Sequence, residues 1–129
     1  MVSVEVSCPV FPSEDPEKIR SALLNIFPTA VLEEGDGKMF GQADLDTFSK
    51  LIRKQKILDT ARNQMQRGMR GKSDRTIFNL NKQVATVGKV SFVDYRTALG
   101  TISVTVQADD IEALIDRVAP MTVNGEEVH

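Results

Sequence analysis

The sequence has few of the residues that usually carry enzyme chemistry. Its 129 residues include one cysteine, Cys8, one histidine, His129, and no tryptophan. A single cysteine excludes an intramolecular disulfide and a thiolate metal cluster within one chain. We expect Cys8 to be a buried, inert thiol, and His129, as the last residue, to be too mobile for a general base or a metal ligand.

Catalytic motifs are also missing. The sequence has no GxGxxG or GKS/GKT motif for phosphates and no ExxH or HxxxH arrangement for a metal. Asp109 and Asp110 could hold a divalent ion together, but adjacent acids at the start of a helix more often cap it. Asp59 is the other carboxylate that a metal-dependent nuclease could use. We rank this enzyme hypothesis last and predict no catalytic residue, no cofactor and no metal.

Long hydrophobic runs are absent as well. No run approaches the roughly 20 apolar residues that a helix needs to span a bilayer. The first residues alternate like a strand and lack the basic region and apolar core of a signal peptide. We therefore expect a cytoplasmic protein without a membrane partner.

Aromatic residues make up only 5% of the chain. Proteins that bind unpaired nucleic acid usually offer aromatic side chains on which bases stack. Phe78 and Phe92 lie in predicted strands and are expected in the core, whereas Tyr95, in a predicted loop, is better placed for stacking. Recognition of folded RNA by shape and backbone is thus favoured over reading of unpaired bases.

The order of the predicted elements favours an α+β fold. Val2, Val4 and Val6 alternate with polar residues as in a half-buried strand, and Gly35 and Gly37 favour a hairpin between two further strands. Strands are predicted at about 2–7, 30–34, 38–42, 75–80, 90–93 and 101–106, and helices at about 13–27, 44–66, 81–87 and 110–119. This order indicates a largely antiparallel sheet with helices packed on one face, in one domain over residues 1–129 with 124–129 as a loose tail.

Basic residues concentrate in the middle of the chain. The segment from Lys50 to Arg75 has nine basic residues against two acidic ones, although the net charge of the whole chain is −2. A positive strip on an otherwise acidic body attracts a polyanion to one place, and RNA is the first candidate. Glycines in the segment 67–72 let backbone amides approach an anion and let arginines follow a line of phosphates. We expect one continuous exposed ridge made of Lys50, Arg53, Lys54, Lys56, Arg62, Arg67, Arg70, Lys72 and Arg75.

A polar stripe interrupts the predicted long helix. Gln55, Asp59 and Arg62 fall on the side that Leu45 and Ile52 occupy earlier in the same helix. In a structural interpretation, Asp59 pairs with Arg62, Gln55 bonds nearby backbone, and the network fixes the helix against the sheet. In a functional interpretation, the helix outruns the core and presents these groups to a ligand. We favour the structural one, because buried polar groups are normally satisfied within the protein.

Four separated blocks of the sequence resemble a known family. The blocks are PSEDPEK at 12–18, RKQKILDTAR at 53–62, NLNKQVA at 79–85 and DDIEALID at 109–116. They resemble a family of small, uncharacterised archaeal proteins described as predicted RNA-binding exosome subunits. The resemblance implies a fold like that of ribosomal protein L-five and contact with structured RNA. It also implies that Lys54, Lys56, Arg62 and Lys82 take part in that contact.

Two functions of different kinds therefore follow from the sequence. The first is a non-catalytic RNA-binding protein, an accessory of RNA processing by the exosome or of ribosome function, with exosome or ribosome-associated proteins as partners. The second is a protein-interaction subunit whose basic strip docks an acidic surface of a partner or of a second copy. The sequence leaves open whether the chain self-associates.

Overall fold

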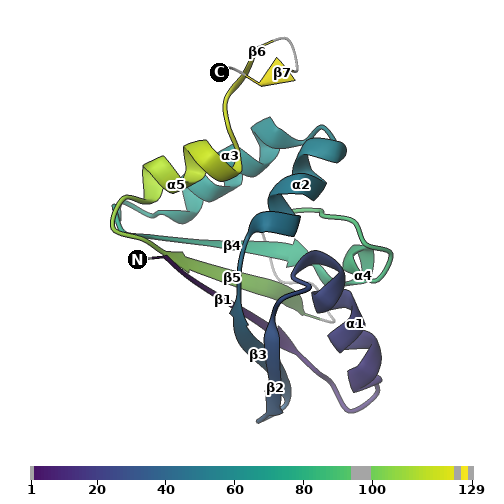
Figure 1. The fold of residues 1–129 in the computed structure, drawn as a ribbon. Helices are drawn as coiled ribbons and strands as arrows, with labels where there is room; N and C mark the ends of the chain where they lie inside the picture. The colour runs from purple at the N-terminus through teal and green to yellow at the C-terminus, as the bar shows by residue number, and fades with distance from the viewer. Residues whose placement is uncertain (1, 94–99, 124–125, 128–129) are drawn as a thin grey trace.

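An antiparallel sheet of five strands forms the centre of the structure. The structure is a computed structural model that describes residues 2–93, 100–123 and 126–127. The strands are β1 (Ser3–Pro9), β2 (Val31–Gly35), β3 (Lys38–Ala43), β4 (Arg75–Asn81) and β5 (Thr101–Gln107). Their order in the sheet is β2-β3-β1-β5-β4, and each neighbouring pair is antiparallel (Figure 1). The predicted α+β class with a largely antiparallel sheet is confirmed.

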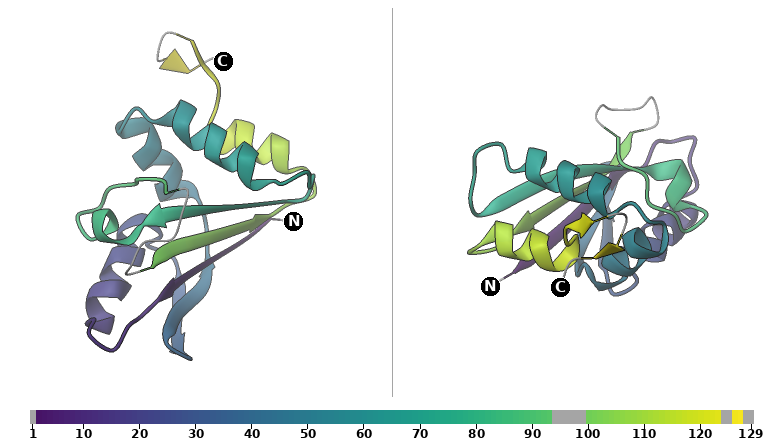
Figure 2. Two further views of the ribbon diagram at one scale, coloured as in Figure 1. Left: turned by 180° about the vertical axis from the view of Figure 1, so that it is seen from behind. Right: turned by 90° about the horizontal axis from the view of Figure 1, so that it is seen from above.

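The helices lie on one face of this sheet. They are α1 (Pro16–Ile26), α2 (Asp46–Lys54), α3 (Leu58–Gly68), α4 (Lys82–Ala85) and α5 (Ile111–Val118). Residues of β1 show why only one face is covered: Val4 and Val6 are buried, whereas Ser3 and Glu5, which alternate with them, are exposed. Because side chains alternate along a strand, the apolar set points to the helices and the polar set to the open face. Figure 2 shows α3 and α5 side by side over the sheet.

The β2–β3 hairpin follows the sequence prediction. Its turn is Asp36 and Gly37, and both have positive φ, 53° and 75°. Positive φ at both turn residues gives the turn that matches the twist of two antiparallel strands. β2 is the outer strand of the sheet, with Val31 74% exposed and Glu33 and Glu34 exposed beside it.

The predicted helix over 44–66 is two helices, and the prediction of one continuous helix is wrong. Lys56, the residue after the C-cap Gln55 of α2, takes a left-handed φ of 59°. The Ile57 N–H donates to Ile52 O at 3.0 Å and the Lys56 N–H to Arg53 O at 3.1 Å. This pair of bonds is the Schellman motif, which ends a helix and usually has glycine at the left-handed position.

Phenylalanines stack in the core between α2 and the sheet. The ring of Phe48 on α2 lies 5.4 Å from that of Phe78 and 6.2 Å from those of Phe27 and Phe92. Phe78 is 2% exposed, and Phe92 is half-buried against the core, as the sequence predicts for both. These contacts attach α2, and the turn after it, firmly to the sheet.

Four further predictions need correction. The first helix begins at Pro16 and not at Ser13, because Asp15 is its N-cap and accepts from the Glu17 N–H. The predicted strand at 90–93 is reduced to a bridge between Phe92 and Leu80. Within the tail predicted as loose, Glu126 and Glu127 form β7 (Glu126–Glu127), which pairs with β6 (Thr122–Val123). The helix at 81–87 ends earlier, at Ala85.

Several other predictions hold. The Asn81 side chain accepts from the Val84 N–H at 3.0 Å and caps α4, and Asp110 caps α5 by accepting from the Ala113 N–H at 3.1 Å. Gly88, with φ of 77°, follows the turn after α4. Within the described part of the chain, no helix has the length and apolar character needed to cross a membrane. The predictions for Tyr95 and His129 fall on residues outside the described ones.

Candidate nucleic-acid interface

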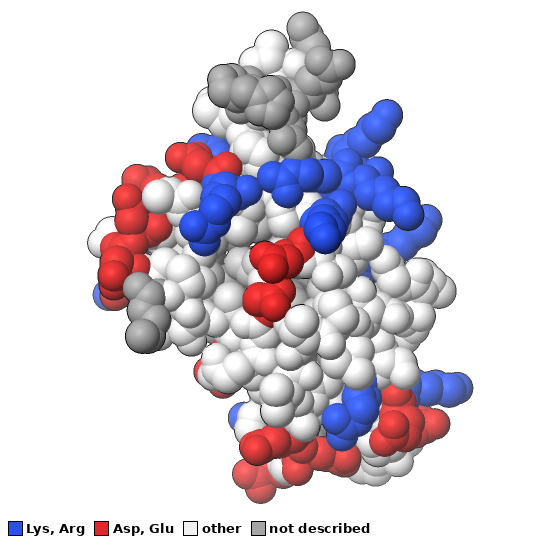
Figure 3. Space-filling model, in the orientation of Figure 1, with Lys and Arg blue, Asp and Glu red and all other residues white. Residues whose placement is uncertain are grey.

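Four cations lie on α2 and on the turn after it: Lys50, Arg53, Lys54 and Lys56, which we call the α2 cluster. The three lysines are exposed, and Arg53 is half-buried. Lys50 and Lys54 are four residues apart and so share one side of the helix. Among residues 2–93, 100–123 and 126–127, none of the three lysines has an ion-pair partner. Figure 3 shows basic side chains gathered over α2 and acidic ones along α5.

Lys56 holds a backbone conformation that favours glycine. Its φ of 59° places a long basic side chain at the C-terminal end of α2. The carbonyl end of a helix has partial negative charge, so a cation there is favourable, but the left-handed backbone costs about 1 kcal/mol for a residue with a Cβ. Conformations of this kind cluster at functional sites.

Two of the predicted ligand residues instead hold the end of α5. The Arg53 guanidinium donates to Arg117 O at 3.2 Å and to the Ser49 hydroxyl, and Ser49 in turn donates to Val118 O at 2.7 Å. Arg62 donates to Ala119 O at 3.2 Å. Three successive carbonyls at the end of α5, which the helix itself leaves without donors, are satisfied in this way. Arg53 and Arg62 therefore stabilise the packing of α5 on α2 and α3.

The predicted network of Gln55, Asp59 and Arg62 does not form as one unit. Gln55 bonds both backbone groups of Val90, with its amide donating to the carbonyl at 2.8 Å and its oxygen accepting from the N–H at 2.7 Å. Arg62 pairs with Asp116 at 2.6 Å and not with Asp59. Asp59 accepts from the Thr122 hydroxyl at 2.6 Å. The Asp59–Arg62 pair of the structural interpretation is therefore wrong, although both residues lie on α3. All three side chains do bond within the protein, but each bonds a different segment.

The remaining basic residues of the strip lie at the other end of α3. We call them the loop cluster; they are Arg67, Arg70, Lys72 and Arg75, and all four are exposed. Their loop is joined to the start of α5, since the Ala108 N–H donates to Asp74 O and the Ile111 N–H to Ser73 O. α3 has 11 residues, so about 16 Å of helix separates this cluster from the α2 cluster. The prediction of one continuous ridge is therefore wrong, and the loop cluster lies beside the acids that begin α5.

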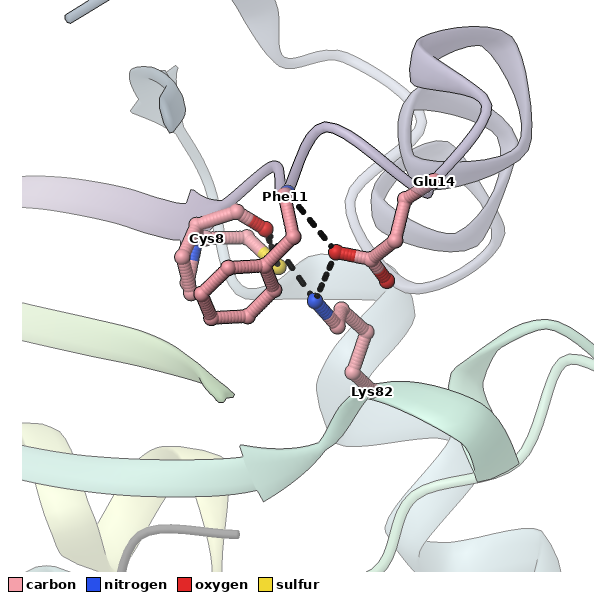
Figure 4. Close-up of polar contacts among 5 residues, drawn as sticks. Cys8, Phe11, Glu14 and Lys82 are labelled. Carbon is pink, nitrogen blue, oxygen red and sulfur yellow. Dashed lines mark hydrogen bonds and ion pairs between the residues drawn. The ribbon is translucent and has the colours of Figure 1, made fainter. Parts of the chain in front are cut away.

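Lys82 is not on the surface. Its side chain is 3% exposed, and its Nζ lies 2.9 Å from Glu14 Oε1 and 3.1 Å from Pro9 O, with the Phe11 ring 5.1 Å away (Figure 4). Glu14 also accepts from the Phe11 N–H at 3.0 Å. The prediction that Lys82 contacts RNA is wrong for this structure, because the ammonium group is enclosed by these partners.

Cys8 lies beside this ion pair and behaves as the sequence predicts. It is fully buried. Burial raises the pKa of the thiol to about 11, although the charge of Lys82 acts in the opposite direction. Because the thiolate is the reactive form of cysteine, Cys8 is inert at neutral pH.

The carboxylates considered for a metal site do not come together. α3 and α5 run antiparallel, with Asp59 near Thr122 and the loop after α3 joined to Ile111. Asp59 and Asp110 therefore lie at opposite ends of the helix pair, and Asp110 caps α5. The described residues contain no group of three acids, cysteines or histidines placed to hold a metal ion.

Sequence reasoning missed two cations that the fold brings to the α2 cluster. Arg117, at the end of α5, lies against α2 through the bond between its carbonyl and Arg53. Lys89 immediately precedes Val90, which pairs with Gln55 at the end of α2. Both are exposed. No sequence signal links them to residues 50–56, because each is placed by a tertiary contact.

Comparisons with known proteins agree on one family. A family model described as RNA binding matches residues 3–108. The chain is 38% identical to a UPF0201 protein of Metallosphaera sedula, over 97% of this chain and 92% of that protein. It is 39% identical to the UPF0201 protein of Methanothermobacter thermautotrophicus, over 93% of this chain and 92% of that protein. A UPF0200/UPF0201 protein of Archaeoglobus fulgidus is 40% identical, but the match covers 98% of this chain and only 40% of that longer protein.

Solved structures show the same fold. The crystal structure of a UPF0201 protein from Methanococcus jannaschii has a TM-score of 0.86 at 35% identity, covering 98% of this chain and 99% of that one. A DUF54 protein from Archaeoglobus fulgidus has a TM-score of 0.64 at 18% identity, covering 93% and 97%. The second likeness concerns the fold alone.

Proposed function

The chain belongs to the archaeal UPF0201 family and matches a family model described as RNA binding, and from this premise we propose that it binds structured RNA through the α2 cluster without catalysing a reaction. The observation that carries the proposal is the exposure of Lys50, Lys54 and Lys56 together, with no ion-pair partner among the described residues. Phosphates are the ligands that such a group attracts most strongly.

The backbone of Lys56 supports the same proposal. A glycine at this position would satisfy the left-handed turn at lower conformational cost, yet the chain has a cation there. Together with the i, i+4 pair of Lys50 and Lys54, it extends the positive surface from the helix onto the turn. The loop cluster is a secondary contact in this proposal, because acids at the start of α5 lie beside it.

The chemical character of the surface favours structured RNA. Among the described residues, the aromatic side chains next to α2 are the stacked phenylalanines of the core, and these are buried or half-buried. Phosphate contacts from lysines read the shape of a folded RNA more than the identity of its bases. The proposal includes a role in the cytoplasm as an accessory of RNA processing by the exosome or of ribosome function, as the family resemblance implies.

A mobility-shift titration with a hairpin RNA tests the proposal. Wild type is compared with Lys54→Ala/Lys56→Ala and with a control of equal charge, Lys18→Ala/Lys38→Ala, whose positions lie on α1 and β3. We expect the first variant alone to weaken binding, and each lost phosphate contact to lower the slope of log K against log salt by about 0.7 to 0.9. Absence of binding by wild type at about 50 mM salt would reject RNA binding, and equal affinity of both variants would reject the α2 cluster.

A protein partner is the second candidate function. Acidic side chains, with basic ones among them, lie around the β2–β3 hairpin at the end of the molecule away from α2 (Figure 3). Docking of the α2 cluster of one copy on these acids of another would be a head-to-tail contact. Light scattering over a salt series measures the molar mass of the protein and so detects self-association. If the protein is a monomer at every salt concentration and still binds RNA, docking of one copy on another is excluded.

A further inference from the structure

A groove lies between α2 and the end of α5, and its α5 side lies outside the residues that the family model matches. Asp46, Ser49, Lys50 and Arg53 of α2 line it together with Arg117 and Val118 of α5, and its volume is about 390 Å³. The family model ends at residue 108, so Arg117 lies outside it. The groove therefore places Arg117, which the family match does not include, beside the proposed RNA-binding helix α2.

The charges in this groove favour an anion. Lys50, Arg53 and Arg117 contribute three cations against the one carboxylate of Asp46. Lys50 and Arg53 are three residues apart on α2, which places their side chains on neighbouring positions of one helix face. A concave surface with an excess of one charge concentrates oppositely charged groups.

The groove is also held in shape before any ligand arrives. The Arg53 guanidinium is bonded to the Ser49 hydroxyl and to Arg117 O, and Ser49 is itself buried and bonded to Val118 O. These bonds set the distance between α2 and the end of α5. Lys50 and the Arg117 side chain are exposed on the two sides. A cationic wall with fixed geometry loses little entropy on binding.

We propose that this groove binds one phosphodiester group of the RNA backbone, with Lys50 and Arg117 as the contacting residues and Arg53 as the positioning residue between them. The proposal rests on the proposed function, because the phosphate belongs to the same RNA. Asp46 opposes the bound phosphate and so limits its affinity. This predicts a gain of affinity when Asp46 loses its charge, which a merely structural role of the groove would not produce.

The test measures affinity for the hairpin RNA at about 150 mM salt, where charges more than about 8 Å apart are largely screened. Arg117→Gln keeps the carbonyl to which Arg53 bonds, and we expect it to weaken binding about threefold to tenfold. Asp46→Asn is expected to tighten binding about twofold to threefold. Lys18→Gln and Glu33→Gln are the matched controls on α1 and β2, and both should leave the affinity unchanged.

Replacement of single phosphates in the RNA by neutral methylphosphonates locates the contact. One linkage should weaken binding to wild type, and the same linkage should have a smaller effect on Arg117→Gln, in which only the Lys50 contact to that phosphate remains. If wild type binds RNA but Arg117→Gln and Asp46→Asn behave as the controls do, the groove is not a phosphate site and the α2 cluster stands alone. If wild type does not bind RNA, both proposals are overturned.

Discussion

Lys82 and Glu14, which are 68 residues apart in the chain, form an ion pair of 2.9 Å in which the lysine side chain is 3% exposed and the glutamate side chain 15%. The pair joins the loop before α1 to the start of α4. Removal of the lysine takes one donor from Pro9 O and leaves the carboxylate with the Phe11 N–H but without its counter-charge. Breaking one side of a buried pair is strongly unfavourable. The pair therefore contributes to the fold and not to ligand binding.

The first prediction concerns this pair. Lys82→Met should lower the free energy of unfolding by about 2 to 4 kcal/mol, because an enclosed carboxylate loses its counter-charge. Urea denaturation followed by circular dichroism measures the change. Lys18→Met, at an exposed position of α1, should change stability by no more than about 0.5 kcal/mol. Equal stability of the two variants would contradict the assigned role of Lys82.

The second prediction is a pH dependence. Burial acts to raise the pKa of Glu14, but the bonds from the Phe11 N–H and from Lys82 outweigh it and hold this pKa below its ordinary value of 4.5. A carboxyl with a lowered pKa in the folded state adds stability above its unfolded pKa, and that stability is lost as pH falls through the folded pKa. Wild type should exceed Glu14→Gln in stability at neutral pH.

The difference between the two proteins is the quantity to measure. It should shrink as pH falls below about 4.5, because wild-type Glu14 then becomes neutral like glutamine. The Thr29 hydroxyl and the Asp46 N–H also hold the pKa of Asp44 below its ordinary value, but Asp44 is present in both proteins and cancels. A difference that stays constant from about pH 7 to pH 3 would exclude the ion pair as its source.

The third prediction concerns Gly68 at the end of α3. A Cβ added there would lie 2.0 Å from Ile77 O and 2.7 Å from Thr76 Oγ1, so α3 could not approach β4 as closely. Helix propensity alone predicts that alanine is better than glycine by about 1 kcal/mol. The close approach instead predicts a loss of about 1 to 3 kcal/mol for Gly68→Ala, as for other overpacked sites.

Gly71→Ala is the matched control. Gly71 has a φ of 79°, and a Cβ added there would have no atom within 4 Å. The left-handed backbone is therefore the only source of strain in this variant. The expected cost is about 1 kcal/mol. Thermal unfolding of both variants ranks them, and a larger loss for Gly71→Ala would falsify the close-approach argument.

The fourth prediction separates stability from binding at Lys56. Lys56→Gly relieves the left-handed backbone, although glycine also gains freedom in the unfolded chain, so stability should stay equal or rise by up to about 1 kcal/mol. RNA affinity should nevertheless fall, because one exposed cation is lost. Parallel unfolding and mobility-shift measurements check both results. A loss of stability together with unchanged affinity would show that Lys56 has only a structural role.

Much of the sheet could be predicted from the sequence, since its signals are local. The alternation of Val4 and Val6 with polar residues gives the face of β1 that packs on the helices, and Gly37 after Asp36 gives the hairpin. Asn81 and Asp110 each cap a helix by accepting from a backbone N–H three residues later, so both caps can be predicted from the local sequence. The α+β class follows from these elements and their order.

The site could be predicted only in part, because its geometry depends on distant contacts. The turn that ends α2 has Lys56 at the left-handed position where glycine is usual. The sequence therefore has no glycine to mark the end of α2, and the apolar periodicity predicts one continuous helix. Arg62 meets Asp116 and Lys82 meets Glu14 across the fold, and neither partner lies within a helical turn of its mate. Charge selected nine residues and the family resemblance added Lys82, whereas tertiary contacts assign three of these ten, Arg53, Arg62 and Lys82, to stabilising the fold.

The outer strand β2 has a consequence for the behaviour of concentrated solutions. Its exposed backbone edge could accept a strand from another molecule, and Val31 would add apolar contact to such stacking. Glu33 and Glu34 oppose it by mutual repulsion between copies. Conditions that neutralise these two carboxylates would remove this protection and favour the joining of two copies, β2 against β2, into one sheet.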